Sequence, residues 1–253
     1  MGIDAVASPG IGLAVVCVVL VAAAAAIYWF ARLGPVVTAP LAAARAVIQL
    51  AAVASVLVVA LSQLWSSLLV LAAMFAAATV TAARRSGAGW SASWLTLSLG
   101  TGACASLLPM LVGGVVPLTG VTVVPIGGIL LGGTMTATSL ASRRALDALE
   151  TRQGEVEAAL SLGFTARDAR WEIISLTAFD ALLPGVDQTR TVGLVTLPGA
   201  FVGVLIASGS AVQAAATQVL VLLGLLLAQA CAVAITIEMV ARGRVHRPGR
   251  VLR

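Results

Sequence analysis

The sequence contains no lysine, one histidine and three cysteines, and aromatic residues make up only 4% of its 253 residues. A P-loop needs the lysine of its G-x-x-x-x-G-K-[ST] motif to bind phosphates, so the chain cannot be an ATPase of that type. The cysteines (Cys17, Cys104 and Cys231) lie in apolar runs and lack the close spacing of a metal or redox motif. We interpret them as small packing residues.

Charged residues are also scarce, at 10% of the chain, whereas 60% of the residues are apolar and the mean hydropathy is +1.07. This composition excludes an ordinary globular domain and predicts an integral membrane protein. The apolar segments run continuously for about 20 residues, which predicts transmembrane helices and an all-α fold. The net charge of +5 comes entirely from arginine. Arginines in membrane proteins usually mark the cytoplasmic side, so no nucleic-acid partner is expected.

Seven spans are expected, and each is bounded by arginines or by glycine and proline. The residues before the first apolar run carry only Asp4, so this run is expected to be a retained span and not a signal peptide. With the N-terminus outside and the C-terminus in the cytoplasm, the arginines lie on or adjoining the cytoplasmic side, as the positive-inside rule requires. The expected spans are about 10–31, 42–61, 67–83, 90–112, 123–141, 191–207 and 212–240.

The chain is expected to form one transmembrane domain over 1–253, with a single cytoplasmic insert over 142–190 that holds most of the acidic residues. The alternating Glu and Arg residues of the insert predict a solvated helix that ends at Gly163. Thr165 then begins a capping-box-like sequence, which predicts a second helix over about 166–183, stopped by Pro184 and Gly185. Because simple connectors are usually much shorter, we expect this insert to be a docking surface for a cytoplasmic protein.

The order EAALSLG, from Glu157 to Gly163, resembles the coupling loop of ABC transporter permeases, in which an EAA-xxx-G core precedes an Ile-x-Leu element. Ile174 and Leu176 stand near the expected place of that element, and Thr177 replaces its usual proline. In such permeases the loop sits in a cleft of the ATPase subunit and transmits its closure. The residues that we assign to coupling are Glu157, Ala158, Ala159, Gly163, Thr165, Arg167 and Asp168.

Four longer segments are similar to a single family, that of the bacterial iron-export ABC permease and the plant aluminium-tolerance membrane protein, long catalogued as an uncharacterised protein family. Where bacterial relatives tend to have an asparagine in the fifth span, this chain has Gly133. The similar segments are RAVIQL (45–50), VVPIGGILLGGTM (123–135), LSLGFTARDA (160–169) and LLPGVDQTRTVGLVTLPGAFVGVLIASG (182–209).

The resemblance implies a multi-pass protein of the inner or plasma membrane, surrounded by membrane lipid, that forms the membrane half of an ABC exporter. It implies no catalysis and no cofactor in this chain, because ATP and Mg would bind to a separate cytoplasmic ABC ATPase subunit. It also implies a homodimer, for which the glycine-rich fifth span is a candidate contact. Iron or a related metal ion is the expected substrate. Nucleotide-sugar or other small-solute transport, or gradient-driven secondary transport, is the alternative.

The metal-binding residues stay unknown at this stage, because the candidates within the spans, among them Cys104, Met110, Thr136 and Gln229, are neutral or soft. Met135 is more typical of packing than of metal binding. Arg45 could extend to the interface or face the bundle interior, and Asp187 could pair with Arg190 or gate the path; we favour pairing. Pro198 and Gly199 are expected to break the sixth span as a hinge. The residues expected to line the translocation path are Arg45, Gln49, Thr134, Met135, Thr138, Asp187 and Arg190.

Overall fold

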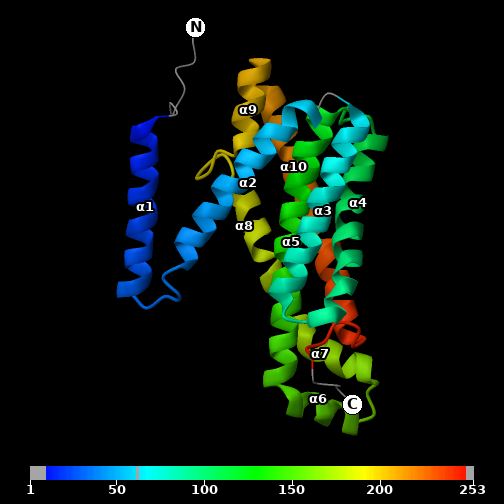
Figure 1. The fold of residues 1–253 in the computed structure, drawn as a ribbon. Helices are drawn as coiled ribbons and strands as arrows, with labels where there is room; N and C mark the ends of the chain where they lie inside the picture. Colours follow the sequence, from blue (N-terminus) through cyan, green and yellow to red (C-terminus); the bar gives the residue numbers. More distant parts are fainter. Residues whose placement is uncertain (1–9, 61–62, 249–253) are drawn as a thin grey trace. The chain divides into compact units, whose positions relative to one another are not determined.

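The computed structural model describes residues 10–60 and 63–248, and all the regular elements in these ranges are helices (Figure 1). The only extended pairing among the described residues is one isolated bridge between Val192 and Thr196. This confirms the all-α prediction. The chain forms two compact units, the first ending at Val59 and the second beginning at Ala60. The expected single domain therefore stays a prediction.

The first unit contains the two apolar helices α1 (Ile11–Phe30) and α2 (Thr38–Ala60). Helix α1 matches the expected span within one residue at each end. Helix α2 starts four residues before the expected position because Pro40 falls in its first turn, where proline has no helical hydrogen bond to lose. The expected end of this span, Leu61, lies outside the described residues.

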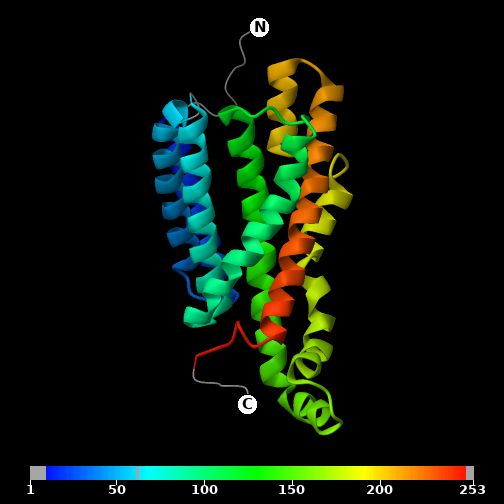
Figure 2. The same ribbon diagram turned by 90° about the vertical axis from the view of Figure 1, so that its right-hand side faces the viewer.

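In the second unit the long helix α5 packs against the three helices α3, α4 and α10 (Figure 2). Small residues allow these helices to approach closely. A Cβ atom on Gly128 of α5 would lie 2.7 Å from Met74 Cε on α3, and one on Gly102 of α4 would lie 3.0 Å from Ala232 Cβ on α10. The bundle helices are α3 (Leu64–Ser86), α4 (Leu95–Val112), α5 (Gly120–Thr151) and α10 (Ala211–Ala241), with the short 3-10 helix η1 (Gly89–Trp94) between α3 and α4.

Helix α5 continues without interruption through Ser142 to Thr151, so the fifth span and the start of the insert share one helix; the bounds of the insert, 142–190, stay a prediction. Ala141, Ala145, Leu146 and Leu149 keep an apolar face on this extension, and that face packs against the rest of the bundle core. The helix therefore extends beyond its apolar span. The rest of the insert consists of α6 (Gln153–Ser161), α7 (Ala166–Ala178) and the short 3-10 helix η2 (Phe179–Ala181).

The expected sixth span, over 191–207 with a break at Pro198, begins later in the chain than the broken element that the structure contains. The chain instead forms α8 (Leu183–Thr191), a non-helical segment over 192–198 and α9 (Gly199–Ser208). Pro184 starts α8, where we expected it to end the preceding helix, because the first turn of a helix tolerates a residue without an N–H group. The expected break at Pro198 is present, but it begins at Val192 and is helped by Gly193, whose φ of 82° favours glycine.

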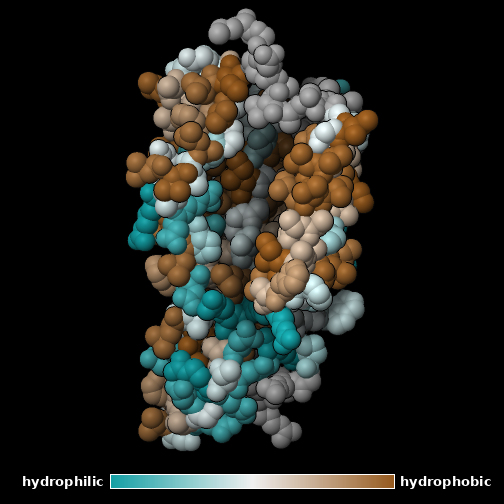
Figure 3. All heavy atoms as spheres, turned by 90° about the vertical axis from the view of Figure 1, so that its left-hand side faces the viewer, coloured by the Kyte–Doolittle hydropathy of each residue, from teal (hydrophilic) through white to brown (hydrophobic). Residues whose placement is uncertain are grey.

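Within the described ranges, six helices are long and apolar enough to cross a membrane, and α9 is a shorter apolar helix. The seven expected spans agree with this count if α8 and α9 together form one broken span. The hydrophilic side chains gather at the end of the second unit that carries α6 and α7, below the brown apolar surface in Figure 3. The orientation, with the N-terminus outside, stays a prediction.

Candidate functional site

The insert forms a helical hairpin whose turn has the expected chemistry. Helix α6 ends at Ser161, and Gly163 follows with a φ of 91°, the left-handed conformation that a helix C-terminus favours. The Thr165 hydroxyl accepts a hydrogen bond from the Asp168 backbone N–H at 3.2 Å and donates one to the Asp168 carboxylate at 2.7 Å. The predicted capping of α7 is therefore confirmed. The hydrogen bonds that the Asp168 carboxylate accepts from the Thr165 hydroxyl and from Arg167 lower the pKa of Asp168.

Helix α7 is held beneath the bundle by contacts to the end of α10. Arg167 donates to the Glu238 carboxylate at 2.6 Å, and Arg170 donates to the backbone oxygen of Ala241 at 3.3 Å. Ile174 is fully buried, and the other predicted members of its face, Trp171, Ala178 and Leu182, pack against the same core. A displacement of α7 must therefore move α10 or break these contacts.

Two further groups of contacts fix the insert to its surroundings. Arg144 on α5 donates to Asp180 on η2 at 2.9 Å. Arg247, in the segment after α10, makes ion pairs with both Asp147 and Glu150 on the extension of α5. These contacts join α5, η2 and the C-terminal segment at the hydrophilic end of the unit.

The tip of the hairpin presents apolar side chains to its surroundings. Leu162 is 79% exposed and Phe164 is 48% exposed, and the two flank Gly163 at the turn. Exposed large apolar residues on a hydrophilic element are typical of an interaction site. The residues assigned to coupling surround this tip: Glu157, Ala158, Gly163, Thr165 and Arg167 are exposed, whereas Ala159 and Asp168 are half-buried.

Two of the residues expected to line a path instead lie in the packed core. Thr134 and Thr138 on α5 are fully buried, and a Cβ on Gly102 of α4 would lie 3.1 Å from the Thr134 methyl group. Thr134 donates to the Leu130 backbone oxygen, whereas the Thr138 hydroxyl has no hydrogen-bond partner among the described residues. Met135 is half-buried and packs against the core, which agrees with its interpretation as a packing residue.

Helix α8 places Asp187 and Arg190 beside the middle of α10, and not at its charged end. A Cβ on Gly185 of α8 would lie 2.8 Å from Gln229 Cδ, so the two helices touch there. Gln229 precedes Glu238 on α10 by nine residues (238 − 229), which is about 13 Å along a helix. The segments α8, 192–198 and α9 follow one another along α10 (Figure 1). The non-helical segment therefore lies near the middle of the span.

Asp187 and Arg190 are both exposed at this depth. Their closest charged atoms are 3.8 Å apart, which is an ion pair but too long for a hydrogen bond. A charged side chain near the centre of a helix costs about 2.5–3.5 kcal/mol on the insertion scale, so ionisable residues there usually mark a pathway or a protein contact. The predicted pairing is confirmed, and the pair is also a candidate for function.

Gln229 joins three elements at the same level. Its side chain fills the space against Gly185 on α8, and its Nε2 would lie 3.0 Å from a Cβ on Gly133 of α5. The side chain is buried, and its Oε1 accepts no hydrogen bond. The glycine at position 133 thus leaves room for an amide that comes from another helix. Sequence reasoning identified Gln229 as a mid-span polar residue but could not show which helices it contacts.

Arg45 and Gln49 lie on α2 in the first unit, where both are exposed and are spaced to share one face, as expected.

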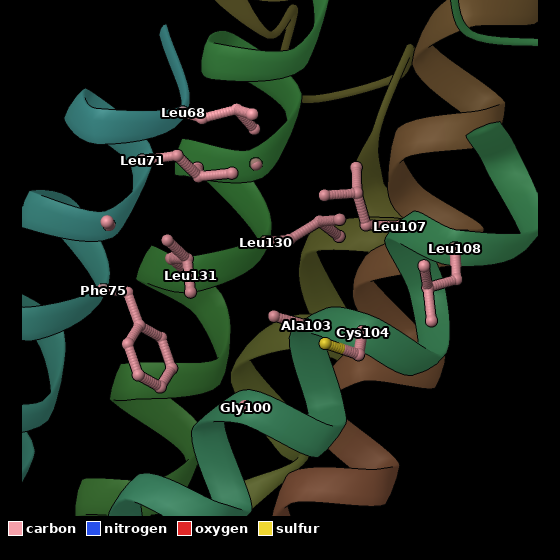
Figure 4. Close-up of a pocket in the computed structure, with 12 residues that line it drawn as sticks. Leu68, Leu71, Phe75, Gly100, Ala103, Cys104, Leu107, Leu108, Leu130 and Leu131 are labelled. Atoms are coloured by element: carbon pink, nitrogen blue, oxygen red, sulfur yellow. The ribbon is translucent and has the colours of Figure 1, made fainter. Parts of the chain in front are cut away.

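In the second unit a pocket of about 370 Å³ opens between α3, α4 and α5 (Figure 4), and its lining is almost entirely apolar. Cys104 points into it among leucines, as a packing residue would. In the part of the chain that the structure describes, no three His, Cys, Asp or Glu side chains gather to hold a metal ion.

Comparison with known proteins gave one family and several relatives. The model of an uncharacterised protein family, UPF0014, matches residues 12–244. A UPF0014 membrane protein of Synechocystis is 35% identical over 74% of this chain and 74% of its own length. The rice UPF0014 membrane protein STAR2 (Oryza sativa subsp. japonica) is 31% identical over 80% of this chain and 72% of its own.

A third relative carries a functional name. The Escherichia coli protein named "probable iron export permease protein FetB" is 31% identical over 51% of this chain and 49% of its own length. No solved structure matched the chain.

Proposed function

Because this chain belongs to the UPF0014 family of multi-pass membrane proteins, we propose that it is the transmembrane subunit of an ABC exporter for iron or a related metal ion. A separate cytoplasmic subunit would bind ATP and Mg and supply the energy, and two copies of this chain would form the membrane part. The relative named for iron export supports the choice of substrate. The hairpin of α6 and α7 supports the coupling to ATP.

The hairpin is the observation on which this proposal rests most. Its apolar tip, Leu162 and Phe164, projects from the hydrophilic end of the unit, where an ATPase subunit could enclose it. Arg167 and Arg170 connect the hairpin to the end of α10, and α10 packs along α4, α5, α8 and α9. A movement of the tip would thus be transmitted to the helices that span the membrane.

The translocation path is proposed to follow the polar side of α8, past Asp187 and Arg190, towards the break over 192–198. Pro198 and Gly199 act as the hinge because the chain has no continuous helix there to resist bending. Thr134, Met135 and Thr138 would change their packing during the cycle and would not bind the substrate directly. Arg45 and Gln49 belong to the first unit, and their expected part in the path stays a prediction.

ATP-dependent uptake of ferrous iron into inverted membrane vesicles tests this function. Vesicles that contain the chain and its ATPase are expected to accumulate iron only when ATP is present. Phe164→Asp should abolish uptake because it places a charge in the apolar contact. Leu118→Asp is the matched control: Leu118 is also exposed, but it lies in the loop between α4 and α5, away from the hairpin.

Broken helices are also common in secondary transporters, so α8 and α9 equally suit a gradient-driven carrier. The same vesicles distinguish the two functions. Uptake that needs an ion gradient, continues without ATP and is unaffected by Phe164→Asp would contradict the ABC exporter and support the carrier.

A further inference from the structure

The segment over 192–198 is irregular backbone between α8 and α9, both of which pack along α10. The N–H groups of Leu194, Val195 and Thr196 all point to the backbone oxygen of Thr191, so the helical hydrogen-bond pattern is lost there. The side chains of Leu194 and Val195 are 89% and 79% exposed. Within a membrane, non-helical backbone is tolerated only where protein or a water-filled cavity covers it. Either protein or a water-filled cavity must therefore cover this segment.

The glycine-rich face of α5, which was the expected dimer contact, is partly occupied within the chain. Cβ atoms on Gly127 and Gly128 would collide with Leu71 and Met74 of α3, and one on Gly133 would collide with Leu225 of α10. Gly132 is exposed, and a Cβ there would meet nothing within 4 Å. Of these four glycines, only Gly132 is open to a second copy while α3 and α10 stay packed on α5.

The face of α8 carries one acidic and one basic side chain that pair with each other at 3.8 Å and are both exposed. Arg190 and Asp187 have side-chain exposures of 69% and 63%. A contact between identical surfaces related by a two-fold axis brings residue i of one copy against residue j of the other, and the reverse. A patch with one positive and one negative charge is complementary to itself under this operation.

We propose that α8, the segment 192–198 and α9 form the contact with a second copy of this chain, across a two-fold axis that passes near α8. Asp187 then faces Arg190 of the partner subunit, and Arg190 faces the partner subunit's Asp187. The contact covers the irregular backbone, encloses the four charges and places the hinges of the two copies side by side. It rests on the proposed function, which requires two membrane halves.

Charge reversal tests the contact because it changes which copies can pair. Asp187→Arg gives a patch with two positive charges, and Arg190→Asp gives a patch with two negative charges. When the two variants are produced together with different affinity tags, the mixed dimer is expected to exceed the statistical proportion by about tenfold, because like charges across an interface are strongly unfavourable. Mixed and matched dimers in statistical proportion would overturn the proposal.

Disulfide cross-linking tests the same contact without altering the charges. Cys17, Cys104 and Cys231 are first replaced by alanine, and then Leu194→Cys or Leu223→Cys is introduced. Leu223 is the matched control, since it is an exposed leucine on α10. Leu194→Cys should form a disulfide-linked dimer and Leu223→Cys should not. If Leu194→Cys instead cross-links to a cysteine placed on α2 of the same chain, α2 covers the segment and the proposal is wrong.

Recovery of the ATPase subunit separates this proposal from the function on which it rests. The hairpin of α6 and α7 lies away from α8, so both charge variants should retain the ATPase. Statistical pairing with the ATPase still bound would reject the contact and leave the exporter intact. Loss of the ATPase from the unmodified chain would reject the exporter itself.

Discussion

Replacing Gly185 by alanine should destabilise the protein through a single clash, and a second substitution should reverse the effect. The new Cβ would lie 2.8 Å from Gln229 Cδ and 3.0 Å from Nε2, with Oε1 closer still. Ordinary contacts begin at 3.4 Å, so the Gln229 side chain or α8 must move by at least 0.6 Å (3.4 − 2.8). Gln229 is buried between α5, α8 and α10 and has little room to move.

Two opposing effects determine how much stability the Gly185→Ala variant loses. Overpacking a core typically costs about 1–3 kcal/mol. Alanine is more favourable than glycine within a helix such as α8 by roughly 0.5–1 kcal/mol. Taking the middle of each range, the net loss should be about 1 kcal/mol, which corresponds to a fall in Tm of roughly 2–4 °C for a chain of this size. Thermal unfolding of the purified chain in mild detergent, followed by tryptophan fluorescence, measures this change in Tm.

The double variant Gly185→Ala with Gln229→Ala removes the three atoms that lie nearest to the new Cβ. Its stability should equal or exceed that of the Gln229→Ala single variant, which gives a coupling energy of about 1–3 kcal/mol. Gly203→Ala in α9 is the control, because its Cβ would meet nothing within 4 Å. A Gly185→Ala chain as stable as the wild type, or one that Gln229→Ala fails to rescue, would refute the contact between α8 and α10.

Three further predictions concern the hairpin. Gly163→Ala forces alanine into a left-handed conformation and should destabilise the turn between α6 and α7 by about 1–2 kcal/mol. Faster hydrogen exchange in this turn would show the effect. In the control Gly154→Ala the new Cβ meets nothing within 4 Å, so exchange should not change. Thr165→Ala should loosen the first turn of α7 by about 1 kcal/mol, whereas Thr165→Ser should retain the cap, and unchanged exchange in the alanine variant would contradict the capping. Finally, hydrogen bonds lower the pKa values of Asp168 and Glu155, so their stabilisation is present at neutral pH and is lost as the pH falls below about 4. Exchange in the hairpin, corrected for intrinsic rates, should increase over that range, and less so in Asp168→Asn; equal increases in both chains would contradict this assignment.

Much of the fold could be predicted because hydropathy and arginine positions determine where spans begin and end. The ends of α1 and α10 agree with the prediction within one residue, and Gly163 and Thr165 show the chemistry of the hairpin turn directly. The break over 192–198 was placed too late because its residues are almost all apolar and resemble a continuous span. Only the backbone shows that Gly193 adopts a positive φ there.

The candidate site was harder to predict because it depends on contacts between distant parts of the chain. Sequence alone cannot show that α8, which carries Asp187 and Arg190, runs beside α10 at Gln229. The ion pair between Arg167 and Glu238 joins residues that are 71 positions apart, and no local pattern predicts it. The exposed tip formed by Leu162 and Phe164 was hidden among apolar residues that fit a helix equally well.

Co-purification from the native membrane tests the central claim most directly. The tagged chain, extracted in mild detergent, is expected to bring with it a small ABC ATPase whose ATP hydrolysis increases when the chain is present. The Phe164→Asp variant should reach the membrane in equal amount but lose this subunit. If no ATPase is recovered with the unmodified chain, or if Phe164→Asp retains it fully, the assignment of the α6–α7 hairpin as an ATPase-coupling element is wrong.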